Sequence, residues 1–337
     1  MNHIFRVLTF VFFSVSLIAQ NESNSPYSRF GLGELQNFSS ATQSAMGGVG
    51  IASYDPLSIN INNPSSYSSV FSQRFTMQTG AIHTTKLLQT NTQNQFVNST
   101  NFNYLMFAFP LTKFWGTSFG LLPFSEMSYS FSDVSDNPSA NLLFEGDGGL
   151  TRVYFGNAIN LNKNLSIGAN LNYLFGNLNS TRKVFFNDVS ILNTKINDDI
   201  NLNGLYIDAG IIYRTKLGKW NSIVGITFDN GSEISAEKKS LIETFRSGGE
   251  FELPEDTISF EKQPEGILEL PSSIGFGFAL NNDNWKILVD YKNVNWEEYR
   301  LLEERDNLKN SSRFGLGFEF IPDKKSINKY YKMIRYR

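Results

Sequence analysis

The chain has no cysteine among its 337 residues, only two histidines, and no long apolar run after its first twenty residues. The lack of cysteine excludes disulfides, thiolate metal sites and a lipid anchor attached to cysteine. The lack of an apolar stretch of about 18 residues excludes a transmembrane helix from the mature chain. The net charge is −3, so the basic excess typical of nucleic-acid-binding proteins is missing and no nucleic-acid partner is expected.

The scarcity of histidine also argues against catalysis. His3 lies in the N-terminal apolar segment, so a Ser-His-Asp hydrolase would have to use His83, which has no carboxylate close by in the sequence. Mutation of His83 would test this disfavoured alternative. The sequence has neither a twelve-residue calcium loop nor a phosphate-binding loop, so we expect no metal, no cofactor and no catalytic residue.

The first twenty residues have the pattern of an export signal. His3 and Arg6 precede an apolar run from Val7 to Ile18, and Ala19 offers a small residue for cleavage. The run is too short to cross a bilayer, so residues 1–20 are predicted to be a Sec signal peptide.

Aromatic residues are abundant, with 30 Phe, 14 Tyr and 4 Trp, although the hydrophobic content is only 41%. From Leu165 to Phe175 large apolar residues alternate with Ser, Gly and Asn, and similar alternation recurs at 205–214, 273–280 and 313–320. Alternation with a period of two is typical of strands with one apolar face. A soluble sandwich also alternates, but it rarely places so many aromatic side chains on one face. The pattern therefore favours a barrel whose outer face contacts lipid.

The lengths of the connections also favour an outer-membrane barrel. Short turns near 113–114, 160–164, 215–219 and 281–284 alternate with long polar stretches, which are interpreted as loops near 87–100, 132–148, 177–202, 231–266 and 295–311. Short periplasmic turns and long outer loops are the usual arrangement. Ten strands are predicted near 72–86, 101–110, 114–131, 149–160, 164–176, 203–215, 219–230, 267–281, 284–294 and 311–321, with an eleventh starting at Lys332.

The predicted fold is thus all-β, an antiparallel transmembrane β-barrel over residues 71–337. Residues 21–70 lack strand periodicity and are rich in Ser, Asn and Gly. A disordered arm is one interpretation of this segment. We favour a plug folded into the barrel, because Gly47 and Gly48 permit close backbone packing and Asn63-Pro64 predicts a turn.

Three further groups of residues have predicted roles. Trp115, Trp220 and Trp285 each follow a short turn, as expected for an interfacial aromatic girdle. Charged residues on the polar strand faces are expected to line the lumen as ion pairs or to hold the plug, with direct ligand contact as the alternative: Arg152, Asp208, Arg214, Asp290, Arg313 and Glu319.

Pro123 is unusual in the third strand, because proline gives no N–H to a sheet ladder. Together with Gly120 it predicts a bend. The bend is either a lateral gate or a bulge near the rim without a role in transport.

Three stretches of the sequence resemble FadL-type outer-membrane transporters. The late-barrel signature of that family is similar to Leu270-Pro271-Ser272-Ser273-Ile274-Gly275-Phe276-Gly277, followed by Trp285, Asp290-Tyr291 and Trp296. The stretch that resembles the N-terminal hatch of the family is Ala45-Met46-Gly47-Gly48, leading to Asn63-Pro64-Ser65. The stretch that is similar to a variant of the family common in Bacteroidetes is Ser25-Pro26-Tyr27-Ser28-Arg29-Phe30-Gly31.

This resemblance implies a barrel of fourteen strands with a plug, so the chain is expected to end about four strands early, as a C-terminally truncated product or with a partner supplying the missing wall. It also implies passive uptake of hydrophobic or amphipathic, fatty-acid-like small molecules across the outer membrane of a Gram-negative bacterium. The expected partners are outer-membrane lipid and the hydrophobic ligand. The alternative is an accessory or scaffold barrel that serves, with other outer-membrane proteins, a secretion or assembly complex.

Overall fold

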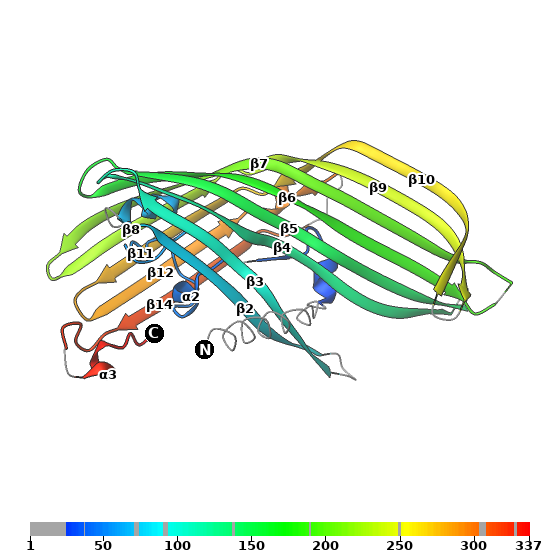
Figure 1. Cartoon of the computed structure of the whole chain (residues 1–337), viewed down its shortest axis with the longest axis horizontal. Coiled ribbons are helices and arrows are strands. Elements are labelled where there is room, and N and C mark those ends of the chain that lie inside the picture. Colours follow the sequence, from blue (N-terminus) through cyan, green and yellow to red (C-terminus); the bar gives the residue numbers. More distant parts are fainter. Residues whose placement is uncertain are drawn as a thin grey trace, which may run out of the picture.

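The computed structural model describes residues 25–36, 38–70, 74–89, 94–136, 139–188, 190–248, 251–302, 308–326 and 329–337. The predicted signal peptide lies outside these residues. The described part of the chain forms one curled antiparallel sheet of 14 strands, with an N-terminal segment lying along it (Figure 1). This arrangement confirms the predicted all-β, antiparallel barrel fold.

The main path of the sheet runs in the order β14-β12-β11-β8-β7-β6-β5-β4-β3-β2, and β9 and β10 extend it beside β7. Its long strands are Thr76–Gln89 (β2), Asn94–Pro110 (β3), Trp115–Asp136 (β4), Ser139–Asn160 (β5), Leu165–Phe186 (β6), Asn193–Leu217 (β7), Trp220–Asp229 (β8), Ser232–Gly248 (β9), Phe251–Leu270 (β10), Ser273–Asn281 (β11), Trp285–Val294 (β12) and Ser311–Phe320 (β14). The two edge strands of the main path are β2 and β14.

The period-two alternation separates the two faces of the sheet as predicted. On β6 the apolar residues Ile167 and Leu171 are exposed, whereas Ser166 and Asn170, which directly precede them, are buried. Successive side chains of a strand point to opposite faces, so the apolar row faces outward and the polar row faces the N-terminal segment. The same outward apolar rows occur on β7, β11 and β14.

The predicted long loops are wrong at four of their five positions. The stretches near 87–100, 132–148 and 177–202 are mostly continuations of β2 to β7, and the stretch near 231–266 is the paired hairpin β9–β10. Beside β7, β9 pairs Asn203 with Ser235 and Asn193 with Phe245. Polar residues occur on both faces of these extensions. The extensions therefore lack the alternation of apolar and polar residues from which a half-buried strand is predicted.

Two further predictions about strands also need correction. The strand predicted over 267–281 is divided at Pro271 and Ser272 into the end of β10 and the start of β11, since proline cannot donate to the ladder. The eleventh strand predicted from Lys332 is absent from the described residues. Instead the short helix α3 (Tyr330–Met333) occupies this position, and only one bridge joins Phe320 to Tyr336.

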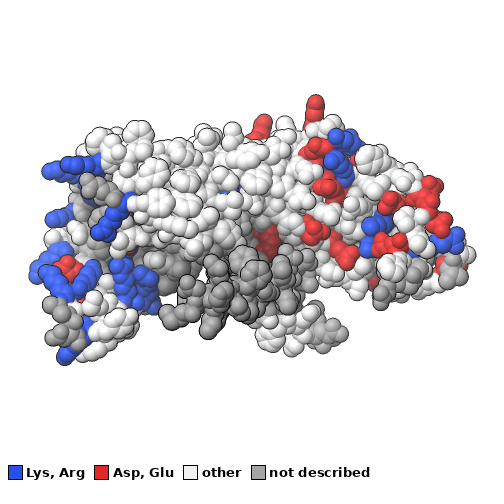
Figure 2. Space-filling view, viewed as in Figure 1, with Lys and Arg blue, Asp and Glu red and all other residues white. Residues whose placement is uncertain are grey.

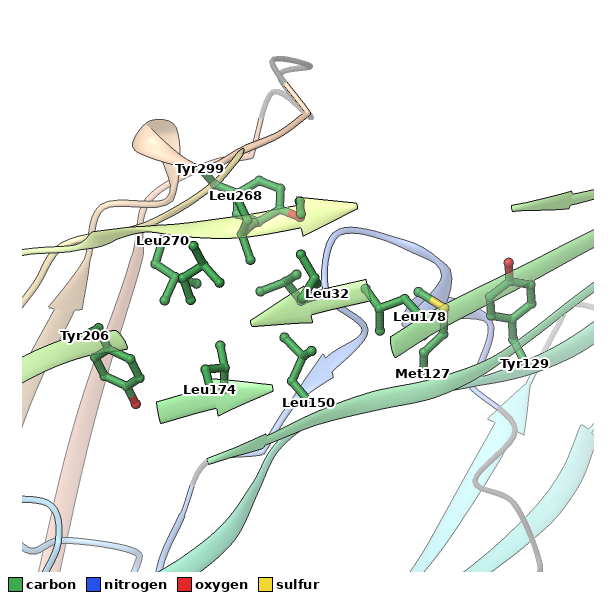
Figure 3. Packing of buried hydrophobic residues seen from close by; sticks show 13 residues of the cluster. Leu32, Met127, Tyr129, Leu150, Leu174, Leu178, Tyr206, Leu268, Leu270 and Tyr299 are labelled. Atoms are coloured by element: carbon green, nitrogen blue, oxygen red, sulfur yellow. The ribbon is translucent and has the colours of Figure 1, made fainter. Parts of the chain in front are cut away.

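The N-terminal segment, residues 25–70, contains only short elements. They are η1 (Pro26–Arg29), β1 (Glu34–Leu35), α2 (Ala41–Ser44) and η2 (Pro64–Ser69). Leu32 of this segment enters a buried apolar cluster with Leu150, Leu174 and Leu268, and Figure 3 shows these side chains around it. A second cluster surrounds Tyr67 and a third contains Val49, so the core lies between the segment and the inner face of the sheet.

A network of ion pairs joins β5, β6, β7 and β10 at the end of the sheet opposite the short turns. Acidic and basic side chains are mixed on the surface there, on the right in Figure 2. Glu252 contacts Lys183 at 2.6 Å and Lys195 at 3.3 Å, and Lys183 also contacts Glu145 at 3.4 Å. Burial alone would raise the pKa of Glu252, but the hydrogen bonds from Lys183 and Lys195 lower it below its ordinary value. Burial would lower the pKa of Lys183, but the hydrogen bond to Glu252 raises it.

We predict that this network loosens in acid. A carboxyl with a lowered pKa in the folded state stabilises the fold above its unfolded pKa, and this contribution is lost as the pH falls through the folded pKa. The protection factors of the β9–β10 amides, which compare the observed exchange rate with the intrinsic rate at the same pH, should therefore fall below the ordinary glutamate pKa of 4.5. The E252Q variant should exchange faster already at neutral pH and respond less to acid. Equal acid responses of the two proteins would contradict this role of Glu252.

Candidate functional site

The candidate site is the interior of the sheet, where the N-terminal segment meets the inward side chains. Asp290 of β12 accepts hydrogen bonds from the backbone N–H groups of Gly50 and Ile51, at 2.6 and 2.9 Å. Asn63 donates from its side-chain amide to the carbonyl oxygen of Ile51 and to that of Ile211 in β7, at 2.8 and 3.3 Å. The segment is thus attached to two strands of the sheet, β12 and β7, through buried polar groups.

Glycines on the inner face let the segment approach the strands closely. A Cβ atom at Gly168 of β6 would lie 2.6 Å from backbone atoms of Pro64 and Ser65, and one at Gly116 of β4 would lie 2.0 Å from the carbonyl oxygen of Tyr67. Contacts this short are not available to a residue with a side chain. These two strand positions therefore need glycine for the observed packing of η2.

Two glycines of the segment itself, Gly47 and Gly48, were predicted to have a structural role, and their backbone conformation requires glycine. Gly47 and Gly48 have φ angles of 71° and 75°, in the left-handed region that favours glycine. Pro64 begins η2, and the side chain of Asn63 accepts a hydrogen bond from the N–H of Ser65. The predicted Asn-Pro turn is therefore present.

A buried polar network lies under η2. The hydroxyl of Tyr67 donates to Asn170 at 3.0 Å, and the side-chain amides of Asn170 and Asn172 donate to Asp208 at 2.8 and 2.7 Å. Arg152 donates from Nη1 to the Tyr206 hydroxyl at 3.0 Å. Sequence reasoning selected Arg152 and Asp208 but missed their polar neighbours, whose only signal was a place on the same polar strand face.

The other predicted charged residues also face inward, but they lie apart. The guanidinium of Arg214 stacks on the Tyr54 ring with its carbon 4.0 Å from the ring centre, near the short turns. Arg313 approaches Gly48, whose Cβ position would be 2.5 Å from the Arg313 Nη2 atom. Glu319 pairs with Arg337 at 2.8 Å. Direct pairing among the six predicted charges is not observed in the described residues, since each contacts other groups.

A cavity of about 450 Å³ lies between the segment and the sheet. Charged side chains from five strands line it: Arg152, Asp208, Asp229, Asp290, Lys292 and Arg313. Apolar side chains also line it, among them Leu35, Phe38, Phe124, Phe228, Leu270 and Trp296. The cavity therefore offers both charged and apolar contacts, which together suit an amphipathic molecule.

The wall beside this cavity is split at the predicted bend. β3 pairs with β4 only between Leu105–Pro110 and Gly116–Leu121. The ladder stops two residues before Pro123, and the register of β4 against β5 shifts between Pro123 and Ser125. In Figure 1 the β2–β3 hairpin diverges from β4 beyond this point. Pro123 and Phe124 line both the split and the cavity.

The N-terminal segment fills the apex of the split. β1 pairs with the free edge of β4, placing Glu34 opposite Glu126. The Lys86 ammonium of the diverging hairpin pairs with Glu34, and the Asn101 amide donates to both carboxylate oxygens of Glu126, at 3.1 and 3.0 Å. Polar groups of the segment and the two strand edges thus bridge the split. No signal in the sequence indicated this pairing.

The three predicted girdle tryptophans are the first residues of β4, β8 and β12, so they lie at one end of the sheet. Trp115 and Trp285 are 38% and 43% exposed on the outer face. His83 is exposed on β2, and its Nδ1 atom lies 2.7 Å from the Thr100 hydroxyl. Within the described residues no cluster of three His, Asp or Glu side chains is arranged to hold a metal, and no helix is long and apolar enough to cross a membrane.

Comparisons with solved structures show the same fold at low sequence identity. The Pseudomonas putida toluene transporter TodX matches with a TM-score of 0.56 and 15% identity, over 82% of this chain and 78% of that one. The Ralstonia pickettii toluene transporter TbuX gives 0.53 and 13%, over 84% and 82%. A Pseudomonas aeruginosa FadL homologue gives 0.53 and 10%, over 82% and 74%.

The expected resemblance to FadL-type proteins is thus supported at the level of the fold. No curated protein matches the sequence. The profile of one protein family, BamG, matches residues 1–337. Because this match spans all of the sequence, the chain belongs to the BamG family.

Proposed function

We propose that the chain is an outer-membrane barrel that conducts amphipathic small molecules from outside toward the bilayer. The exposed apolar rows on β6, β7, β11 and β14 support the placement in a membrane, because soluble monomers rarely expose so extensive an apolar surface. Lipid would contact these rows, and the tryptophans at the strand starts would form the interfacial girdle. The short turns would face the periplasm.

The observation that carries this proposal is the cavity of about 450 Å³ that reaches the split between β3 and β4. An amphipathic ligand would place its head near Arg152 and Asp208, and its apolar part near Phe124 and Leu35. Movement of β1 away from β4 would then open a path from the cavity to the lipid. The toluene transporters that share the fold support a hydrophobic cargo.

The bend at Pro123 offers a direct test of the lateral path. A valine supplies the N–H that proline lacks, so P123V should allow β4 to remain paired with β3 and narrow the split. We expect cells that express P123V to take up radiolabelled toluene or oleate no faster than cells without the protein. Pro254 of β10 also adjoins a register shift, but it lies far from the cavity, so P254V is the matched control. Undiminished uptake by P123V would show that the bend is only a bulge.

A second candidate function is that of an accessory barrel in an assembly of outer-membrane proteins. The observation that favours it is the open edge of β4: beyond β1 and the hydrogen bonds of Ser25 and Ser28 with Ser128, the part of β4 from Ser130 onward has no ladder partner on its β3 side in the described residues. Open edges invite pairing with another chain. The paired hairpin β9–β10 further enlarges the sheet beyond the length needed to cross a bilayer.

Purification from native membranes separates the two functions. A lone barrel that carries extracted hydrophobic molecules would support transport, whereas a stable stoichiometric complex with other outer-membrane proteins would support the accessory role. Bulky charged substitutions on the free edge of β4, at Ser130 and Ser132, should disrupt such a complex without altering uptake. Both side chains are exposed, so these substitutions should not unfold the sheet.

A further inference from the structure

The end of the sheet that carries the short turns is strongly basic. Figure 2 shows Lys and Arg side chains gathered over this end, on the left, whereas both signs of charge occur at the opposite end. Lys113 and Lys163 lie on the turns before β4 and β6, and Lys216 and Lys219 lie at the turn between β7 and β8. This asymmetry is not needed to form the fold, because turn residues at this end are exposed.

Two of these turns border a wide, open groove with a volume of about 890 Å³. Its polar lining includes three cationic side chains, Lys113, Lys163 and Arg214. Its apolar lining includes Phe114 and Leu161, which are 56% and 57% exposed. The groove therefore combines a cluster of positive charge with apolar side chains that continue onto the outer face of the sheet.

The three cations of the groove are not neutralised by carboxylates. Among the described residues, none of them takes part in an ion pair. Arg214 is nevertheless held in place, because it donates to Asn160 at 3.0 Å and to the Lys163 carbonyl oxygen at 3.3 Å. It also stacks on Tyr54. A fixed guanidinium beside two free ammonium groups is well suited to bind phosphate oxygens.

We propose that this groove is a headgroup site for an anionic phospholipid of the periplasmic leaflet. The phosphate would lie among Lys113, Lys163 and Arg214, and an acyl chain would follow Phe114 and Leu161 onto the outer face. An acidic protein would use the cations but leave these outward apolar side chains without a role, so the groove fits a lipid better. The inference rests on the proposed placement in the outer membrane.

The test measures lipid preference of the full chain in detergent micelles. Dioleoyl-phosphatidylglycerol and dioleoyl-phosphatidylcholine are added in equal amounts, and bound lipid is counted by native mass spectrometry. We expect wild type to retain phosphatidylglycerol selectively. The K113Q/K163Q variant should lose this preference by on the order of 20-fold, since each cation near an anionic lipid surface contributes about fivefold. The K239Q/K262Q variant removes two cations at the opposite end and should retain the preference.

Three outcomes would overturn the proposal. One is equal retention of the two lipids by wild type, and another is an unchanged preference in K113Q/K163Q. The third is displacement of phosphatidylglycerol by millimolar inorganic phosphate alone, which would indicate a site for free phosphate. Insertion is checked separately by protease protection of the wild type in vesicles. A protein that fails to insert contradicts the proposed function, whereas one that inserts without lipid preference contradicts only this inference.

Discussion

Valine at both Gly116 and Gly168 is expected to turn the chain into an open pore. The added Cβ atoms would overlap the backbone of η2, at 2.0 Å from the Tyr67 carbonyl oxygen and 2.6 Å from atoms of Pro64 and Ser65. Around Gly116 and Gly168 both strands are held by regular ladders with β5, so η2 must move instead. Its displacement would also break the hydrogen bond from Tyr67 to Asn170. We expect the interior, which residues 25–70 are predicted to plug, to become a path for water and ions.

Conductance across planar bilayers measures this effect. The wild-type protein should give few openings, whereas G116V/G168V should give discrete steps of high conductance. Ala169 follows Gly168 in the sequence, but its side chain is exposed on the outer face. The A169V variant therefore adds similar bulk to the same strand without touching η2, and it should behave as wild type. High conductance of the wild type, or silence of the double variant after verified insertion, would contradict the role of residues 25–70 as a plug.

The sequence was most informative where a strand separates two different environments. Ile167 and Leu171 alternate with Ser166 and Asn170, so this part of β6 was predicted within one residue of its observed start. Beyond about Gly176 the same strand continues to Phe186 with water-exposed polar residues on both faces. No contrast between faces remains there, and a strand of this kind resembles a polar loop in its composition.

The candidate site was predictable only in part, for a related reason. A charge on the polar face of a strand must point inward, so Asp290 and Arg152 were found without a structure. Their partners come from distant parts of the chain: the residues that donate to Asp290 precede it by 240 and 239 positions. Likewise, the pairing of β1 with β4 depends on where the segment crosses the split, and a strand of two residues has no periodicity to detect.

Removal of the Asp290 carboxylate should free the middle of the N-terminal segment. In D290A the N–H groups of Gly50 and Ile51 lose their buried acceptor, and the wild-type bonds to it are short, at 2.6 and 2.9 Å. Hydrogen bonds to charged groups contribute about 1.5–3 kcal/mol each and are not additive, so we expect destabilisation of the segment by roughly 2–4 kcal/mol. Chymotrypsin should then cleave at Tyr54 and Tyr67, of which Tyr67 is buried in wild type.

The pattern across three variants distinguishes this attachment from general damage to β12. D290N keeps an oxygen acceptor without the charge, so its cleavage rate should lie between those of wild type and D290A. Tyr291 follows Asp290 but is exposed on the outer face, so Y291A should leave the segment protected. The strands should stay folded in all three, because the ladders of β12 with β11 and β14 are made by backbone groups. If D290A were as resistant as wild type, the segment would be held by its other contacts, and Asp290 would not be the group that attaches it to β12.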